Sequence, residues 1–146
     1  MVKAPDALVW EIVGHNNSFL RKKSGHTRRT GTIAFSTEPG NLPSLSSFKY
    51  SGLASSQAVD VTPGETGAVL TLRNAAKVGA HPSKATATVP LTKCFRKSVR
   101  TIAATAGSPY YRPDLKDAAL AKYDAVYRSN RIARGVKKAV KSKQGR

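Results

Sequence analysis

Four residues in the sequence have side chains suited to nucleophilic or acid–base chemistry. His15, His26 and His81 are dispersed, and no acidic residue lies beside any of them at a catalytic spacing. Catalytic sites assemble in three dimensions, but nothing in the order of these residues favours one. Cys94 falls on the apolar face of a predicted helix, where a free cysteine usually behaves as a small buried hydrophobe. We therefore expect Cys94 to be a buried structural thiol and the chain not to be an enzyme.

The residues that hold metals and cofactors are also poorly represented. A single cysteine excludes an internal disulfide and a cysteine-rich zinc site. The eight acidic residues are mostly isolated, which makes them poor ligands for a metal. The sequence has neither a glycine-rich phosphate loop nor a dinucleotide-binding fingerprint. We predict that the chain uses no metal and no cofactor.

The basic residues carry the strongest signal. The 146 residues include 25 Lys and Arg against 8 Asp and Glu, which gives a formal net charge of +17. Such a charge repels itself unless a polyanion neutralises it. Binding to nucleic acid releases condensed counterions, so a very basic chain binds nucleic acid strongly. An anionic membrane surface is the alternative partner, and we favour nucleic acid.

The positive charge is concentrated in three blocks. Residues 21–29 hold five bases, residues 93–112 hold five and residues 128–146 hold eight, all without an acid. The segments between the blocks are nearly neutral and contain the hydrophobic periodicity. This distribution predicts a folded body with cationic regions that contact RNA phosphates. The residues predicted to bind RNA are Arg21, Lys22, Lys23, Arg28, Arg29, Lys49, Lys93, Arg96, Lys97, Arg100, Arg112, Arg128, Arg131, Arg134, Lys137, Lys138, Lys141 and Lys143.

Each block also has a simpler interpretation. A run of charged residues is usually a solvated loop, and charged residues on one side of a helix can simply be its solvent-exposed face. Helix faces generally mix charges of both signs, however, and these blocks do not. Membrane-binding helices usually present Trp, Phe or Leu, whereas the apolar residues after Arg128 are only Ile, Val and Ala. Tyr110 and Tyr111 are suited equally to stacking on bases and to packing between helices.

The elements that must position these blocks fall into two groups. The first 89 residues mostly predict short strands, after a short helix at residues 6–13 that Asp6 would cap and Gly14 would end. A strand is the alternative interpretation of that first segment. A basic loop would join the first two strands as a hairpin, and residues 77–83 would form another loop. The strands are predicted at residues 17–22, 30–36, 48–51, 58–61, 68–73 and, at an edge, 84–89.

The remainder of the chain has helical periodicity. One helix would begin near Pro90 and end before Gly107. A second would begin at Asp114, with Asp117 completing a capping box. We predict an α+β fold, with a small antiparallel sheet, a helical pair and a basic C-terminal extension. Residues 1–127 would form a single domain and residues 128–146 an RNA-binding tail that becomes ordered on RNA.

Nothing in the sequence predicts insertion into a membrane or export. No run approaches the ~20 apolar residues that a spanning helix needs. Asp6 and Glu11 interrupt the apolar segment near the N-terminus, which argues against a secretory signal and a mitochondrial transit peptide. We therefore expect a protein of the cytosol or nucleus.

Four short segments together resemble a known family. They are NSFLRK (residues 17–22), FSTEPGNL (residues 35–42), SFKYSGL (residues 47–53) and YRPDLK (residues 111–116). In this order and spacing they resemble the L28e family, ribosomal protein twenty-eight of the eukaryotic large subunit. The apolar surroundings of Trp10 fit as well, and the resemblance extends from about Leu8 to Arg128.

The resemblance implies a role in the ribosome. Members of this family are small α+β proteins without catalytic activity, held by ribosomal RNA and neighbouring ribosomal proteins. It implies a monomer within the cytoplasmic ribosome, with assembly in the nucleolus. The alternative is a nucleolar ribosome-assembly factor with a similar N-terminal domain. The chain departs from the family pattern in two longer loops, around residues 25–27 and 75–83.

Overall fold

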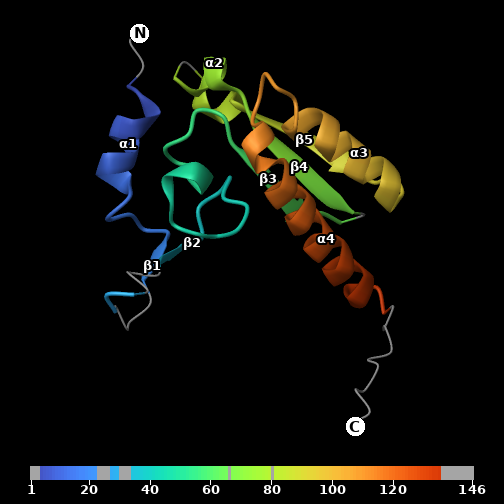
Figure 1. Cartoon of the computed structure of the whole chain (residues 1–146). Coiled ribbons are helices and arrows are strands. Elements are labelled where there is room, and N and C mark those ends of the chain that lie inside the picture. The colour runs from blue at the N-terminus through green and yellow to red at the C-terminus, as the bar shows by residue number, and fades with distance from the viewer. Residues whose placement is uncertain (1–3, 23–26, 30–33, 66, 80, 136–146) are drawn as a thin grey trace.

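The computed structural model describes residues 4–22, 27–29, 34–65, 67–79 and 81–135 (Figure 1). Its α-helices are α1 (Asp6–Val13), α2 (Ala75–Val78), α3 (Phe95–Ala106) and α4 (Lys116–Ala133). Its strands are β1 (Leu20–Lys22), β2 (Ala34–Ser36), β3 (Val59–Pro63), β4 (Ala68–Arg73) and β5 (Thr86–Leu91). Short 3-10 turns occupy Phe48–Tyr50, Pro82–Lys84 and Pro113–Leu115. The mixture of small antiparallel sheets and helices confirms the predicted α+β class.

The main sheet is an antiparallel meander in the order β3-β4-β5. Strand β4 lies in the centre; it pairs along its whole length with β5 and from Ala68 to Leu72 with β3. Val59, Val61 and Leu70 are fully buried. Their β-branched or bulky side chains at alternate positions direct one face of the sheet into the core.

Helices α3 and α4 share that core with the sheet. Ile102 of α3 and Ala119 and Tyr123 of α4 are fully buried. The rings of Phe95 and Tyr123 stack with centroids 5.5 Å apart, and Tyr127 lies 5.0 Å from Phe95. The helices run in opposite directions, so the start of α3 and the end of α4 lie at the same end of the molecule (Figure 1).

The long segment between β2 and β3 is fixed by two acidic residues with little exposure. Glu38 accepts hydrogen bonds from Asn41 Nδ2 at 3.0 Å and from Ser51 Oγ at 3.4 Å. Asp60 accepts one from the backbone N–H of Gly40 at 3.2 Å. At Gly52, a Cβ atom would lie 2.0 Å from the carbonyl oxygen of Pro39, so the crossing of these two stretches requires a glycine.

Helix α1 lies at the side of the molecule and buries none of its residues. Its carboxylate at Asp6 accepts hydrogen bonds from the backbone and side chain of Ser56, at 2.9 and 3.0 Å. The ring of Trp10 lies 6.2 Å from that of Phe48. The predicted helix is therefore confirmed and its strand alternative is wrong. The predicted cap is also wrong, because Pro5 holds the N-cap position and Asp6 binds Ser56.

Three predicted elements in the first part of the chain differ from the structure. Phe48–Tyr50 forms a 3-10 turn instead of a strand. Ala75–Val78 forms a short helix where the loop was predicted to begin, because the side chain of Asn74 caps it by accepting from the N–H of Ala76. The predicted hairpin is present as β1 and β2, but β1 is shorter than the NSFLRK segment.

The start of α3 also differs from the prediction. Pro90 belongs to β5, where it pairs with Val69 at the edge of the sheet, a position that tolerates a residue without an N–H. The helix begins only at Phe95, which places Cys94 at the N-cap, where it is exposed. The prediction of a buried structural thiol is therefore wrong. The predicted capping box at Asp114 is wrong as well, because its carboxylate binds Arg112 instead.

Candidate nucleic-acid interface

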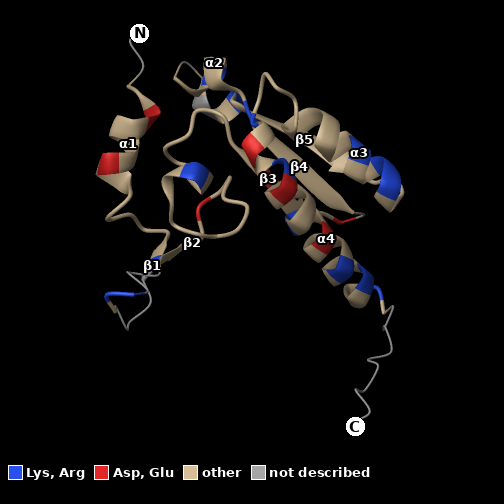
Figure 2. Cartoon of the chain, viewed as in Figure 1, with Lys and Arg blue, Asp and Glu red and all other residues tan. Residues whose placement is uncertain are grey.

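Cations of α3, of α4 and of the residues beside them gather at one end of the molecule (Figure 2). We call this region the basic end; it comprises Lys93, Arg96, Lys97, Arg100, Arg128, Arg131 and Arg134. All seven are exposed. The antiparallel arrangement of α3 and α4 brings these blocks together although they lie about thirty residues apart in the sequence.

The amphipathic pattern of α3 turns its cations outward. Ser98, Ile102 and Ala106 recur every four residues and are buried against the core. Arg96, Lys97 and Arg100 occupy the opposite, exposed face. No carboxylate of the described residues pairs with these three side chains, so their charges remain available to a polyanion.

Helix α4 extends past residue 128, where the basic tail was predicted to begin. The helix continues without a break through Arg128 and ends at Ala133, so the boundary at residue 128 falls inside an element. Arg128 pairs with Asp124 one turn earlier at 2.6 Å, with its side chain 74% exposed. An exposed pair of this kind contributes little stability and does not block contact with a phosphate.

The hairpin block lies apart from the basic end, below α1 in Figure 2. Arg21 of β1 is exposed, as are Arg28 and Arg29. The backbone of Lys22 belongs to β1 and pairs with Ala34. The structure thus presents two separate basic regions.

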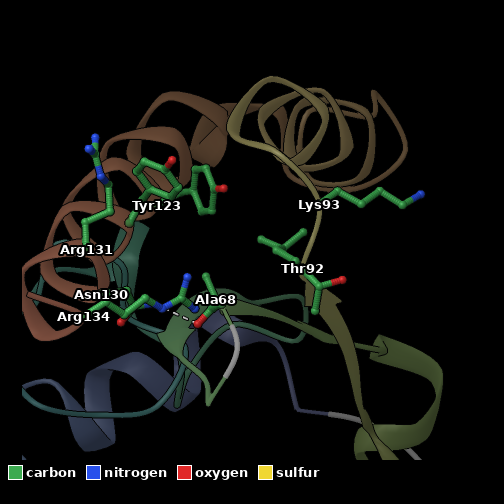
Figure 3. A pocket seen from close by; sticks show the side chains of 10 residues that line it. Ala68, Thr92, Lys93, Tyr123, Asn130, Arg131 and Arg134 are labelled. Carbon is green, nitrogen blue, oxygen red and sulfur yellow. Dashed lines mark hydrogen bonds between the residues drawn. The ribbon is translucent and has the colours of Figure 1, made fainter. Parts of the chain in front are cut away.

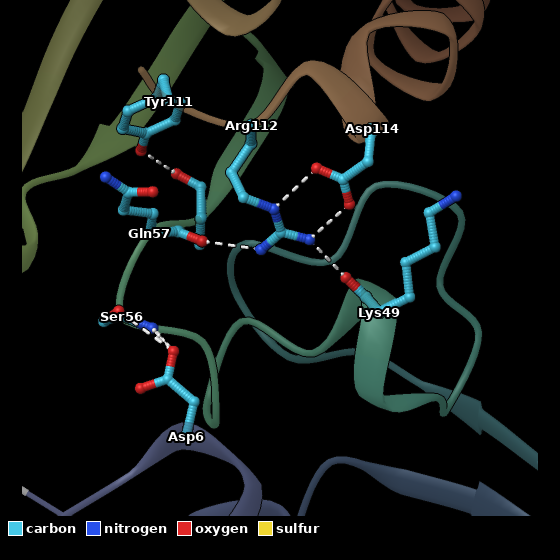
Figure 4. Close-up of polar contacts among 8 residues, drawn as sticks. Asp6, Lys49, Ser56, Gln57, Tyr111, Arg112 and Asp114 are labelled. Carbon is cyan, nitrogen blue, oxygen red and sulfur yellow. Dashed lines mark hydrogen bonds and ion pairs between the residues drawn. The ribbon is translucent and has the colours of Figure 1, made fainter. Parts of the chain in front are cut away.

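Arg112 has an intramolecular role that its place in a basic block did not suggest (Figure 4). Its guanidinium forms a bidentate pair with Asp114, with both N···O distances 2.9 Å. It also donates to the carbonyl oxygens of Gln57 at 3.0 Å and Lys49 at 2.8 Å. The side chain therefore connects the start of α4 with the loop before β3. Lys49 itself is exposed, with its ammonium 5.4 Å from the centre of the Tyr50 ring.

The pKa values around Arg112 follow from these contacts. The hydrogen bonds from Arg112 lower the pKa of Asp114, and those to Asp114 raise the pKa of Arg112. Burial raises the pKa of the neighbouring Tyr111. That hydroxyl accepts from the N–H of Arg73 at 3.0 Å and lies 2.8 Å from the carbonyl oxygen of Ala58. Of the two adjacent tyrosines, Tyr111 therefore packs, while Tyr110 is 92% exposed.

A small pocket opens at the basic end between α4 and the segment after β5 (Figure 3). Its volume is about 70 Å³. It is lined by Gly67, Ala68, Leu91, Thr92, Lys93, Tyr123, Tyr127, Asn130, Arg131 and Arg134. Asn130 donates a hydrogen bond to the carbonyl oxygen of Gly67 at 2.8 Å, which ties α4 to the turn between β3 and β4.

The sequence did not reveal every charged residue with a role. Lys122 of α4 reaches Asp60 of β3 at 2.7 Å and the carbonyl oxygen of Asn41 at 3.2 Å. In the sequence, this role was indicated by the position of Lys122 on the same side of the helix as the buried residues. Asn130 and Tyr127, which line the pocket, were also not among the predicted RNA-binding residues. The predicted RNA-binding residues Lys23, Lys137, Lys138, Lys141 and Lys143 lie outside the described residues.

The described part of the chain presents neither a metal-binding cluster nor a membrane-spanning helix. Its His, Cys, Asp and Glu side chains form no group of three that would hold a metal ion. Of the helices described, none is long and apolar enough to cross a membrane.

Comparison with known proteins assigns the chain to a family. The model of the ribosomal L28e protein family matches residues 8–129. The chain belongs to the ribosomal L28e protein family. This membership confirms the family suggested by the four sequence segments, and it also confirms that the chain is a ribosomal protein and not an enzyme.

Similarity to individual L28e proteins extends over most of the chain. The large ribosomal subunit protein eL28 of Caenorhabditis elegans is 41% identical over 102 residues, which cover 70% of this chain and 75% of that protein. The eL28 protein of Dictyostelium discoideum is 35% identical over 137 residues, covering 93% and 94%. That of Schizosaccharomyces pombe is 31% identical over 126 residues, covering 85% and 91%.

Proposed function

We propose that this L28e protein is a structural constituent of the large subunit of the cytoplasmic ribosome and binds ribosomal RNA through two basic regions. The basic end would be the larger contact and the β1–β2 hairpin the second. Lys49, whose carbonyl oxygen accepts from Arg112, would add a phosphate contact of its own. Arg112 is left out, because its guanidinium is already bound within the protein.

The observation that carries this proposal is the convergence of the α3 and α4 cations on one surface. A globular protein without a polyanionic partner gains nothing from placing so many like charges together, because they repel one another. Contacts to phosphates would position the protein on folded RNA, and the shape of the RNA would supply specificity. The body formed by the main sheet and its two helices would hold the cations in fixed positions.

Salt dependence tests the mechanism directly. If the chain engages about 6–10 phosphates, its affinity for large-subunit ribosomal RNA should fall ~10³–10⁵-fold between 50 and 200 mM salt. Filter binding over this range measures the effect. An affinity that does not change with salt would refute the proposed phosphate contacts.

The cellular role needs a separate experiment. We propose that the chain joins the large subunit in the nucleolus, as a single copy beside neighbouring ribosomal proteins, and stays there during translation. On a sucrose gradient of a cell extract, it should therefore sediment with large subunits and polysomes. Confinement to precursor particles would instead support a role as an assembly factor.

A further inference from the structure

We infer that the pocket at the basic end binds one unpaired nucleotide of RNA, taken from a bulge or loop. This inference rests on the proposed RNA-binding function and adds to it. The exposed cations of α3 suit the backbone of any RNA, whereas a recessed site selects a nucleotide that has left its helix.

The walls of the pocket come from parts of the chain that the fold holds firmly. One wall is the last three turns of α4, and the other is the segment from Leu91 to Lys93 (Figure 3). Ala68, which is buried, lies at the bottom. The hydrogen bond from Asn130 to Gly67 fixes the first wall to the bottom. A preformed cavity of this kind loses little entropy when a ligand enters.

The charge around the pocket suits a phosphodiester. Lys93, Arg131 and Arg134 all line it, and no carboxylate belongs to its lining. In Figure 3, the side chains of Lys93 and Arg131 extend outward on opposite sides of the opening. Cations at the opening would hold the phosphates on either side of a nucleotide whose base enters.

The interior is suited to part of a nucleoside. A volume of about 70 Å³ is several times the ~10–15 Å³ that one water molecule requires. Tyr127 is half-buried and belongs to both the pocket lining and the aromatic group with Phe95. Aromatic side chains stack on unpaired bases without strong preference among them. Bases in a duplex are already stacked and do not reach such a ring.

Two hairpin RNAs test the inference with the full chain. One carries a single bulged uridine in its stem, and the other has the same stem fully paired. Fluorescence anisotropy should show that the chain prefers the bulged hairpin by at least about five-fold, the low end of what stacking on an aromatic ring provides. Equal affinity for the two hairpins would overturn the inference.

Three variants separate the pocket from the general effect of charge. Tyr127→Leu removes the aromatic ring from the pocket without changing the net charge, so it should abolish the preference and leave binding to the paired hairpin unchanged. Arg131→Gln, an exposed substitution compatible with folding, should weaken binding to the bulged hairpin more than to the paired one. The matched control Arg100→Gln removes the same charge away from the pocket and should weaken both equally.

The variants also distinguish failure of this inference from failure of the proposed function. If Tyr127→Leu folds and keeps the wild-type preference, or if Arg131→Gln and Arg100→Gln behave alike, the pocket is not the nucleotide site. The salt-dependent affinity for RNA would then still stand. Loss of that salt dependence in the wild-type chain would instead refute the proposed function.

Discussion

At the scale of single residues, the Tyr111 hydroxyl forms hydrogen bonds with the backbone of two separate parts of the chain. It connects the N–H and carbonyl groups of Arg73, at the end of β4, with the carbonyl group of Ala58, just before β3. The N–H of Arg73 also donates to the carbonyl oxygen of Ala58 at 2.9 Å, so the hydroxyl adds hydrogen bonds at a point where the two strands are already joined. The residue therefore stabilises the sheet from the loop that precedes α4.

Removing this hydroxyl should destabilise the protein. We expect Tyr111→Phe to lower the free energy of unfolding by about 0.5–1.5 kcal/mol, because the hydrogen bonds of the hydroxyl to Ala58 and Arg73 would be lost. Urea denaturation followed by circular dichroism measures the change. Tyr110→Phe is the matched control and should have no effect, since Tyr110 is 92% exposed. Equal stability of the two variants would contradict the role of Tyr111.

The pair formed by Asp114 and Arg112 should make stability depend on pH. Because Arg112 lowers the pKa of Asp114 in the folded protein, the pair stabilises the fold above the usual carboxyl pKa of about 3.9. That contribution is lost as the pH falls through the lowered value. Asp114→Asn should therefore be less stable than the wild type at neutral pH, and the difference should shrink below about pH 4.

Unfolding experiments across this pH range test the sign of the effect. Glu11→Gln on α1 serves as the control, because Glu11 is exposed. Its difference from the wild type should remain small throughout. A destabilisation by Asp114→Asn that grows as the pH falls would show that the pair does not act in this way.

At the scale of elements, Lys122 and Asp60 connect α4 with β3. The pair is 2.7 Å long, with the two side chains 26% and 12% exposed. Lys122→Met would leave the Asp60 carboxylate with fewer partners in a place poorly accessible to water. We expect a loss of about 1.5–3 kcal/mol in the free energy of unfolding, the range for hydrogen bonds to charged groups.

Another ion pair on the same helix provides the comparison. Arg128→Met breaks the exposed pair with Asp124 and should cost only about 0.3–0.5 kcal/mol. Thermal unfolding of both variants measures the contrast. Similar losses would mean that burial does not determine the strength of these pairs.

The elements that could be predicted from the sequence are those in which local pattern and tertiary contacts agree. Strand β4 begins and ends where the sequence predicts, because its apolar residues alternate and its ends meet polar turns. The start of α3 was misplaced because Pro90 is equally suited to a helix start and to an edge strand. Only pairing with β4, an interaction distant in sequence, decides between them.

Contacts distant in sequence also limited how much of the candidate site could be predicted. Blocks of like charge identified the exposed cations of α3 and α4, since no acid accompanies them. The sequence did not show that these blocks meet at one end or that a pocket lies between them. It also placed Arg112 among the RNA-binding residues, because the bonds to Gln57 and Lys49 join positions more than fifty residues apart.

The motifs that carried the family resemblance turn out to hold the fold together. FSTEPGNL supplies Glu38 and Asn41, and SFKYSGL supplies the Ser51 hydroxyl that donates to Glu38. YRPDLK supplies Tyr111 and the Arg112–Asp114 pair. Family membership was therefore recognisable from residues that stabilise the fold, while the exposed cations are the basis of the proposed RNA binding.

At the scale of the whole molecule, the basic regions should contribute separately to RNA binding. Replacing Arg96, Lys97 and Arg100 together with Gln should reduce the dependence of binding on salt by about one unit of logarithmic slope for each phosphate that the variant no longer neutralises. Replacing Arg21, Arg28 and Arg29 should give a second, additive reduction, since the hairpin lies apart from the basic end (Figure 2). Affinity titrations at several salt concentrations measure both slopes. Unchanged slopes would mean that the protein binds RNA through other residues.

The position of α1 has a consequence for how the molecule meets a polyanion. This helix carries Asp6 and Glu11 and no base, whereas the opposite helical end of the molecule is strongly cationic (Figure 2). An electric field exerts a torque on a body charged so unevenly. During diffusion towards RNA, the protein should rotate until its two basic regions, the basic end and the β1–β2 hairpin, face the RNA and α1 is turned away. The orientation of the protein would thus be largely selected before first contact, which shortens the search for the bound pose.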